Sequence, residues 1–322
     1  MELREIPKPV PKDGEVLIRI HASTATAGDC EMRSLRLPLM LSLSMRAYVG
    51  IRRPTRMTIL GQEFAGTIES VGKSVRRFRE GDEVFGMSGF KSGGYAEYLC
   101  RPESPKEMDG VLTEKPPTIG FHEAAAISLG GLESLHYLKE ADIQPGQKLL
   151  VIGAGGSIGS FGVQLAKHFG AEVTAVDSTP KLDMLRSLGA DHVVDYTTSD
   201  VTQDGATYDV ILDVVGKTSI ARGMKCLADR GIYLMANPRI SKMLRGRIAA
   251  RGTRKKIVSG NVVYSTERLE YLKGLVEEGT VRVVIDRTYP LEETADAHRY
   301  VETGRKTGNV IIAVHEGNRQ GE

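Results

Sequence analysis

The sequence predicts an α/β protein with a doubly wound parallel sheet, and three observations support this fold class. Helical and strand patterns alternate from Phe121 to about Ser265, which is typical of parallel strands covered by helices on both faces. The apolar run at 148–152 breaks into a glycine cluster, and a helical pattern follows it. A second apolar run, at 172–176, ends in an acid, Asp177.

Short β-like runs and turns occupy the first 120 residues, before this alternating segment. Strand composition is found at 15–21 and 66–71, and glycines mark the turns between such runs. Helices are expected at 122–140, 157–169, 180–188 and 218–228, with strands at 149–152, 172–176, 192–195, 208–214 and 231–235. The last part of the chain is expected to form a helix at 267–278 and β-like runs at 281–287 and 309–314.

The glycine cluster predicts a binding site for the pyrophosphate of a dinucleotide. Its glycines let the backbone approach phosphate, and the free N–H groups of the following helix face the negative charge. The spacing, G-x-x-G-x-x-G, is looser than G-x-G-x-x-G, so a plain strand-to-helix turn is the alternative. The residues expected to hold the pyrophosphate are Gly153, Gly155, Gly156, Ser157, Ile158 and Gly159.

Asp177 follows Gly159 by eighteen positions, close to the ~20 residues expected for an acid that bonds the adenosine ribose. A carboxylate there would repel a 2′-phosphate and so favours NAD(H). Ser178, Thr179 and Lys181 follow at once, and side chains of these types bind phosphate. We therefore expect both cofactors to be used, with NAD(H) no worse than NADP(H).

The composition is that of an ordinary globular protein, with 26% charged and 41% hydrophobic residues. A net charge of +2 calls for no nucleic-acid partner. Three distant cysteines without a C-x-x-C pattern suit a reducing cytoplasm. The N-terminus has no apolar signal core, and no run of ~18 apolar residues predicts a membrane span.

A series of ordered motifs covers nearly the whole chain. They are Gly61-Gln62-Glu63-Phe64-Ala65-Gly66, Phe78-Arg79-Glu80-Gly81-Asp82-Glu83-Val84-Phe85-Gly86, Gly93-Gly94-Tyr95-Ala96-Glu97-Tyr98, the glycine cluster, Leu188-Gly189-Ala190-Asp191 and Gly308-Asn309-Val310-Ile311-Ile312. In these motifs the sequence resembles the medium-chain dehydrogenase/reductase superfamily, in its zinc-free quinone oxidoreductase branch.

The resemblance implies a GroES-like β catalytic domain made from both chain ends (1–122 and 266–322) and a Rossmann domain between them (123–265). It also implies an active-site cleft between these domains, and a homodimer. Among the cofactor-binding residues it adds Val215 and Asn309. On the substrate side the candidates are Thr26, Asp29 and Tyr48, of which Asp29 has a helix N-cap, and Tyr48 a packing role, as the alternative.

Residue chemistry argues against zinc. Zinc-dependent relatives carry a His in a Gly-His-Glu triplet, where this chain has Gln62, and an amide is a poor zinc ligand. Their first Cys corresponds to Thr26 and a later one to Gly130-Gly131. The four-Cys structural lobe is also missing, since residues 86–112 contain only Cys100.

Without a metal, hydride transfer to a quinone or conjugated carbonyl remains feasible, because conjugation spreads the developing charge. The resemblance therefore implies an NAD(P)H-dependent reductase of small hydrophobic quinones, enones or enals. An alcohol dehydrogenase-like activity is one alternative. A non-catalytic, membrane-associated scaffold that senses the nucleotide is another.

Two basic segments depart from this pattern. Residues 32–62 contain six arginines and no acid, and Leu and Met are interleaved with the arginines. Residues 239–256 contain eight Lys or Arg and no acid. A solvated face is one interpretation; an apolar lid over the substrate, or contact with an anionic membrane, is the other.

The N-terminal stretch 2–7 resembles one that usually follows an initial strand hairpin, so we expect either a late start or an exposed sheet edge.

Overall fold

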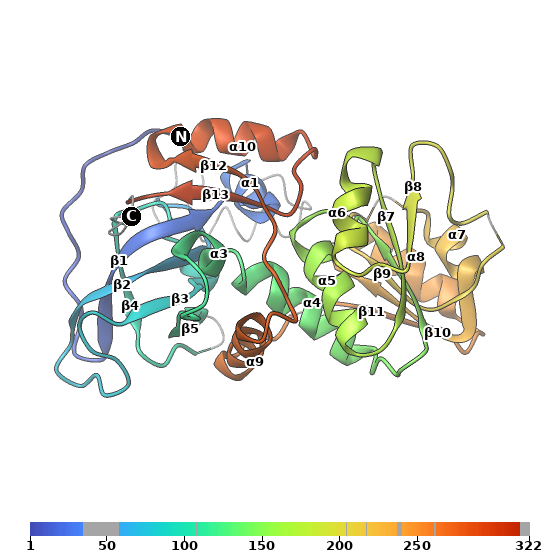
Figure 1. Cartoon of the computed structure of the whole chain (residues 1–322), viewed down its shortest axis with the longest axis horizontal. Helices are drawn as coiled ribbons and strands as arrows, with labels where there is room; N and C mark the ends of the chain where they lie inside the picture. The colour runs from blue at the N-terminus through green and yellow to red at the C-terminus, as the bar shows by residue number, and fades with distance from the viewer. Residues whose placement is uncertain are drawn as a thin grey trace. The chain divides into compact units, whose positions relative to one another are not determined.

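The computed structural model describes residues 1–34, 58–106, 109–203, 205–216, 218–236, 240–260 and 262–315. Contacts divide the chain into two compact units (Figure 1). Unit 1 comprises Met1–Leu129, Tyr264–Gly279 and Val283–Glu322, and unit 2 comprises Gly130–Val263 and Thr280–Arg282. The domain boundaries predicted from the sequence, at 122/123 and 265/266, remain predictions.

Unit 1 is built on a seven-stranded sheet of order β12-β13-β1-β2-β3-β5, with β4 also paired to β1. Its strands are β1 (Glu15–Thr24), β2 (Glu63–Val71), β3 (Glu83–Met87), β4 (Tyr98–Pro102), β5 (Val111–Glu114), β12 (Ile285–Pro290) and β13 (Asn309–Ala313). Antiparallel pairing of β1 with β13 joins the two ends of the chain in one sheet. The strand predicted at 281–287 begins four residues later, at Ile285.

Alternation along β1 explains this unit's core. Val16, Ile18 and Ile20 point to one face and pack with Phe64 and Val84 in a fully buried cluster. The helices of unit 1 are α1 (Ala27–Ser34), α3 (Phe121–Ala125), α9 (Thr266–Glu277) and α10 (Thr294–Glu302), with 3₁₀ turns at Gly89–Lys91 and Leu291–Glu293. α10 was not predicted, and the helix predicted at 122–140 is two helices, α3 and α4 (Ser128–Glu140).

Unit 2 contains a six-stranded parallel sheet of order β11-β10-β9-β6-β7-β8. Its strands are β6 (Lys148–Ile152), β7 (Glu172–Asp177), β8 (His192–Asp195), β9 (Tyr208–Asp213), β10 (Leu227–Met235) and β11 (Lys256–Ser259). The helices are α5 (Ser157–His168), α6 (Leu182–Ser187), α7 (Ile220–Cys226) and α8 (Ile240–Ala250), with a 3₁₀ turn at Thr179–Lys181. α5 and α6 lie on one side of the strands and α7 and α8 on the other, so the doubly wound fold is confirmed (Figure 1).

Three central strands of unit 2 were predictable because they are buried on both faces, whereas β11, at the edge of the sheet, was not predicted. β6, β7 and β9 are almost continuous apolar runs, as strands covered by helices require. In the parts of the chain that the structure describes, no helix is long and apolar enough to cross a membrane.

Candidate functional site

The predicted glycine turn lies at the carboxyl edge of the parallel sheet, between β6 and α5. Gly153 has φ of +81°, and a Cβ there would lie 2.2 Å from Val215 Cγ2. A Cβ on Gly159 would lie 2.3 Å from the Gly153 carbonyl oxygen. These two glycines are therefore required by the turn itself and by the close approach of α5 to β6.

Gly156 is different, because it faces open space. The nearest atom to a Cβ there would be 3.8 Å away, and Gly156 is the residue that caps α5. It has no side chain to accept from the first amides of the helix, and those amides have no partner within the helix. Uncapped N–H groups beside a Cβ-free space fit the pyrophosphate of a dinucleotide, to which the helix N-terminus offers a partial positive charge.

Asp177 lies at the end of β7 and is 6% exposed. Its carboxylate accepts hydrogen bonds from the backbone N–H groups of Gly155 and Ser178, both at 2.8 Å. Lys181 Nζ lies 3.2 Å from the same carboxylate, and both side chains are 8% exposed. The structure thus brings together four of the predicted cofactor residues, Gly155, Asp177, Ser178 and Lys181, and it pairs Asp177 directly with a cation.

A second acid, Asp213, ends β9, which pairs with β6 on the side away from β7, and is fully buried. It accepts hydrogen bonds from Gly216 N (2.8 Å), Tyr233 OH (2.9 Å) and Lys242 Nζ (2.7 Å). The bond to Gly216 fixes the loop that carries Val215, whose side chain is 45% exposed beside Gly153. Sequence reasoning missed Asp213, although an acid at the end of a parallel strand was the signal used for Asp177.

In unit 1, Thr26 and Asp29 form a reciprocal cap at the start of α1. Asp29 Oδ2 accepts from Thr26 N (3.0 Å) and from Thr26 Oγ1 (2.6 Å), and Asp29 N donates to Thr26 Oγ1 (3.0 Å). The residue that precedes α1 is therefore Thr26, and Asp29, for which the N-cap role was the alternative, lies in the first turn of the helix. Burial raises the pKa of Asp29 to about 6.

Glu63, another buried acid that sequence reasoning did not assign to the site, lies in β2 close to α4. Its carboxyl accepts from Leu129 N (2.6 Å) and from the Thr24 hydroxyl. Complete burial raises the pKa of Glu63 to about 7, against these hydrogen bonds, which lower it. Glu63 is therefore protonated in a large share of molecules at neutral pH.

Tyr95, His298 and Cys30 form a third polar group of unit 1. Tyr95 OH donates to the Thr24 carbonyl (3.0 Å) and lies 3.0 Å from His298 Nε2, while Cys30 Sγ lies 3.4 Å from His298 Nδ1. Burial lowers the pKa of His298 to about 4 and raises the pKa of Cys30 to about 12. The imidazole is thus neutral and the thiol protonated at pH 7.

Two further predicted residues have different outcomes. Asn309, at the start of β13, is 3% exposed and its Nδ2 donates to the Val284 carbonyl (3.0 Å), so its side chain holds β12 and β13 together in unit 1. Its role toward a cofactor remains a prediction. Tyr48 lies outside the described residues.

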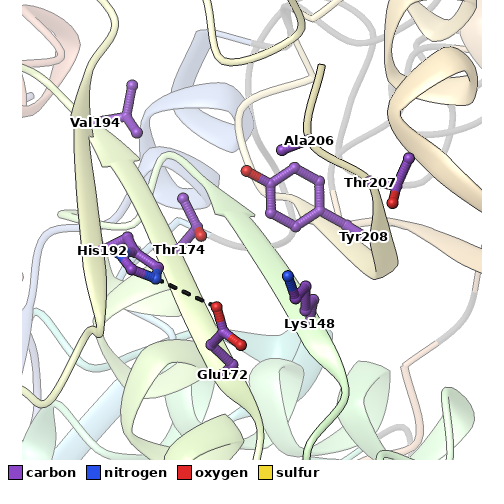
Figure 2. A pocket seen from close by; sticks show the side chains of 8 residues that line it. All are labelled: Lys148, Glu172, Thr174, His192, Val194, Ala206, Thr207 and Tyr208. Carbon is purple, nitrogen blue, oxygen red and sulfur yellow. Dashed lines mark hydrogen bonds and ion pairs between the residues drawn. The ribbon is translucent and has the colours of Figure 1, made fainter. Parts of the chain in front are cut away.

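A cavity of about 240 Å³ opens at the other edge of the parallel sheet. Lys148, Glu172, His192 and Tyr208 line it, and each stands at the amino end of its strand. Figure 2 shows His192 turned toward Glu172, with Nε2 and Oε1 3.2 Å apart. This cavity is at the opposite end of the strands from the glycine turn, so it is not the dinucleotide site.

Among the described residues, no group of three or more His, Cys, Asp or Glu side chains could hold a metal ion. Cys30 is engaged with His298, and its raised pKa disfavours the thiolate that zinc requires.

A parallel sheet with a glycine turn at its carboxyl edge, together with a β unit closed by both chain ends, defines a two-domain dinucleotide-dependent oxidoreductase. Two family models match the chain: "Alcohol dehydrogenase GroES-like domain" over residues 12–107 and "Zinc-binding dehydrogenase" over residues 188–312. The chain is 30% identical to an NADPH-dependent alkenal/one oxidoreductase, chloroplastic, of Arabidopsis thaliana, over 94% of this chain and 73% of that protein.

It is also 35% identical to a 2-methylene-furan-3-one reductase of Solanum lycopersicum, over 79% of this chain, and the match spans 63% of that relative's length. The solved quinone oxidoreductase of Coxiella burnetii superposes with a TM-score of 0.85 at 26% identity, covering 98% of this chain and 95% of that one. The chain belongs to the medium-chain dehydrogenase/reductase superfamily, in its quinone oxidoreductase-like branch.

Proposed function

We propose that the chain is a zinc-independent NAD(P)H-dependent reductase of quinones or conjugated carbonyls. The observation that carries this proposal is the glycine turn before α5, whose uncapped amides adjoin the open space at Gly156. Relatives named for alkenal/one, enone and quinone reduction support the substrate class.

The roles of the chain's own residues follow from the site. The amides of Gly156, Ser157, Ile158 and Gly159 hold the pyrophosphate, and the turn made by Gly153 and Gly155 brings the backbone close to it. Asp177 and Ser178 bond the adenosine ribose. Val215, beside Gly153, and Asn309 are the further residues that we assign to cofactor binding.

Lys181 decides how strictly this site excludes a 2′-phosphate. Alone, the Asp177 carboxylate would repel it, but Lys181 lies 3.2 Å away and offsets part of that charge. We therefore propose that both NADH and NADPH are used.

When bound, the cofactor supplies a hydride. The acceptor needs no Lewis acid, because a quinone or enone spreads the developing charge over its conjugated carbonyl. On the substrate side we assign Thr26 and Asp29 the task of shaping the loop, since the Thr26 hydroxyl already donates to Asp29. Tyr48 is retained as the candidate proton donor, with water as the alternative source.

The assembly and the compartment belong to the same proposal. Among the described strands, β11 is at the edge of the parallel sheet and pairs only with β10. An open edge of this kind favours pairing with a second copy, so we propose a homodimer. No disulfide joins the three cysteines, which suits the reducing cytoplasm.

The test is turnover of NADH and NADPH with a simple quinone and an enone, and of NAD⁺ and NADP⁺ with a primary alcohol, each before and after treatment with a chelator. We expect quinone or enone reduction that survives chelation. Oxidation of the alcohol alone, lost on chelation, would point to alcohol dehydrogenase activity. Dinucleotide binding without turnover of any acceptor would point to the sensing scaffold.

A further inference from the structure

Helix α8 has an outer face that does not pack against the rest of unit 2. Its inner side is well packed: Met243 lies against the core of the sheet, and a Cβ on Gly246 would lie only 3.0 Å from Ile257 Cδ1. Lys242, on the same side, is held by Asp213. These positions recur every three or four residues and define one helix face.

The opposite face combines two exposed aliphatic side chains with arginines. Leu244 and Ile248 are 60% and 63% exposed and stand one turn apart. Arg245, Arg247 and Arg251 are exposed around them and have no ion-pair partner among the described residues. Residues 240–256 contain seven Lys or Arg and no acid. The solvated face of a helix is typically charged or polar throughout, and the exposed Leu and Ile at the centre of this face depart from that pattern.

We propose that this outer face of α8 docks on an anionic lipid surface. Arginines around aliphatic side chains match a layer of acidic headgroups over an apolar interior, into which Leu244 and Ile248 would insert. The helix has only eleven residues, so it would lie in the interface.

Charge complementarity favours this occupant over two others. In a two-fold contact between copies, α8 would meet its own arginines, and like charges would oppose the contact. A single-stranded nucleic acid would favour aromatic side chains for base stacking, and α8 has none.

The position of α8 gives docking a consequence for unit 2. The Lys242–Asp213 ion pair, 2.7 Å long, fixes the helix to the carboxyl end of β9, where Gly216 N is also bonded to Asp213. A membrane at α8 would therefore lie beside the edge of the sheet that carries the glycine turn. This arrangement suits an acceptor that is dissolved in lipid, a point that depends on the proposed function, whereas docking itself does not.

The experiment measures co-sedimentation of the full chain with vesicles of phosphatidylcholine, with and without phosphatidylglycerol. We expect binding only to the anionic vesicles, weakened by salt as screening shortens the range of the charges. Arg245→Glu/Arg247→Glu should weaken binding by at least about 25-fold, at about fivefold for each arginine lost. Leu244→Ser/Ile248→Ser should also weaken vesicle binding at high salt, where the charges are screened and only the insertion of aliphatic side chains still contributes.

The matched control is Lys73→Glu/Arg186→Glu, which changes the net charge equally with one exposed residue on each unit. It should bind like the wild type. Dinucleotide affinity, measured on every variant, verifies folding and is independent of vesicle binding.

Several results would overturn the proposal. They are absence of wild-type binding to anionic vesicles, equal loss in the control, and unchanged vesicle binding in the α8 variants. If those variants instead lose retention on single-stranded RNA, or become monomers in sedimentation while still binding vesicles, the occupant is a nucleic acid or a second copy.

Discussion

Buried carboxylic acids differ within this protein according to what compensates them. Asp213 and Asp177 each have a lysine within hydrogen-bonding or ion-pair distance. Glu63 and Asp29 are held mainly by backbone N–H and hydroxyl donors, and burial raises the pKa of both. A lysine thus compensates the carboxylates of the first pair, whereas burial shifts the second pair toward the neutral acid.

Glu63 should therefore make the protein less stable as the pH rises. Its pKa is raised from 4.5 to about 7, so the folded state keeps a proton that the unfolded state has lost. Stability is lost between pH 4.5 and pH 7, by up to about 3 kcal/mol from this group. Glu63→Gln, whose amide can still bond Leu129 N and Thr24, should flatten the free energy of unfolding over this pH range.

Denaturant unfolding at several pH values checks this expectation, with the exposed Glu80→Gln as control. An identical pH dependence in Glu63→Gln and wild type would show that Glu63 is ionised in the fold.

Asp177 and Lys181 should set the cofactor preference together. Asp177→Ser removes the charge that opposes a 2′-phosphate, and the ratio of kcat/KM for NADPH over NADH should rise more than about tenfold. Lys181→Met should lower that ratio, while Lys225→Met, on the exposed side of α7, should leave it unchanged. Steady-state kinetics with both cofactors decides this. If the wild type strongly prefers NADPH and Asp177→Ser does not change the ratio of kcat/KM, Asp177 has no role in cofactor choice and only stabilises the turn.

At the scale of elements, two glycines of one turn should respond differently to a side chain. Gly156→Val places its branches in open space, so the fold should survive while dinucleotide affinity falls by about tenfold to a hundredfold, through loss of charge-assisted hydrogen bonds. Gly159→Ala places a Cβ 2.3 Å from a carbonyl oxygen and should cost about 1–3 kcal/mol of stability.

Calorimetric titration with NADH and thermal unfolding separate the two effects. Unchanged affinity in Gly156→Val would mean that the pyrophosphate is not held at this turn.

The Lys242–Asp213 pair should be a strong link between elements α8 and β9. Lys242→Met leaves a fully buried carboxylate without its cation and should reduce the free energy of unfolding by about 3–5 kcal/mol. Asp213→Asn/Lys242→Met should recover much of this loss. Arg222→Met, which breaks an exposed pair with Asp200, should cost less than about 1 kcal/mol. A Lys242→Met protein as stable as Arg222→Met would contradict the assignment.

Prediction from sequence succeeded for elements whose signal is local. β6, β7 and β9 are apolar throughout, and the turn at Gly153 needs a positive φ, so both could be recognised in the sequence. α8 could not, because Gly246 lowers helix propensity and the helix is stabilised by packing on β11. Asp213–Lys242 and Tyr95–His298 are 29 and 203 residues apart, and only the tertiary fold brings them together.

For the whole molecule, catalysis without a metal is the most direct test of the proposal that this enzyme is independent of zinc. Gln62 carries an amide, which is a poor zinc ligand, and the Cys30 thiol is protonated and engaged by His298. Purified protein treated with a chelator should keep its quinone reductase activity and contain less than stoichiometric zinc by mass spectrometry. One tightly bound zinc per chain, with activity lost on its removal, would contradict this.

The pairing of β1 with β13 has a consequence for folding during synthesis of the chain. Most of unit 2, from Gly130 to Val263, is continuous in sequence and can fold while the ribosome is still adding residues. The sheet of unit 1 is incomplete until β13 (Asn309–Ala313) has been made, so residues 22–24 of β1 keep an unpaired edge until almost the end of translation. Nascent chains arrested before β13 should therefore depend on chaperones that shield exposed strands, and released chains should not.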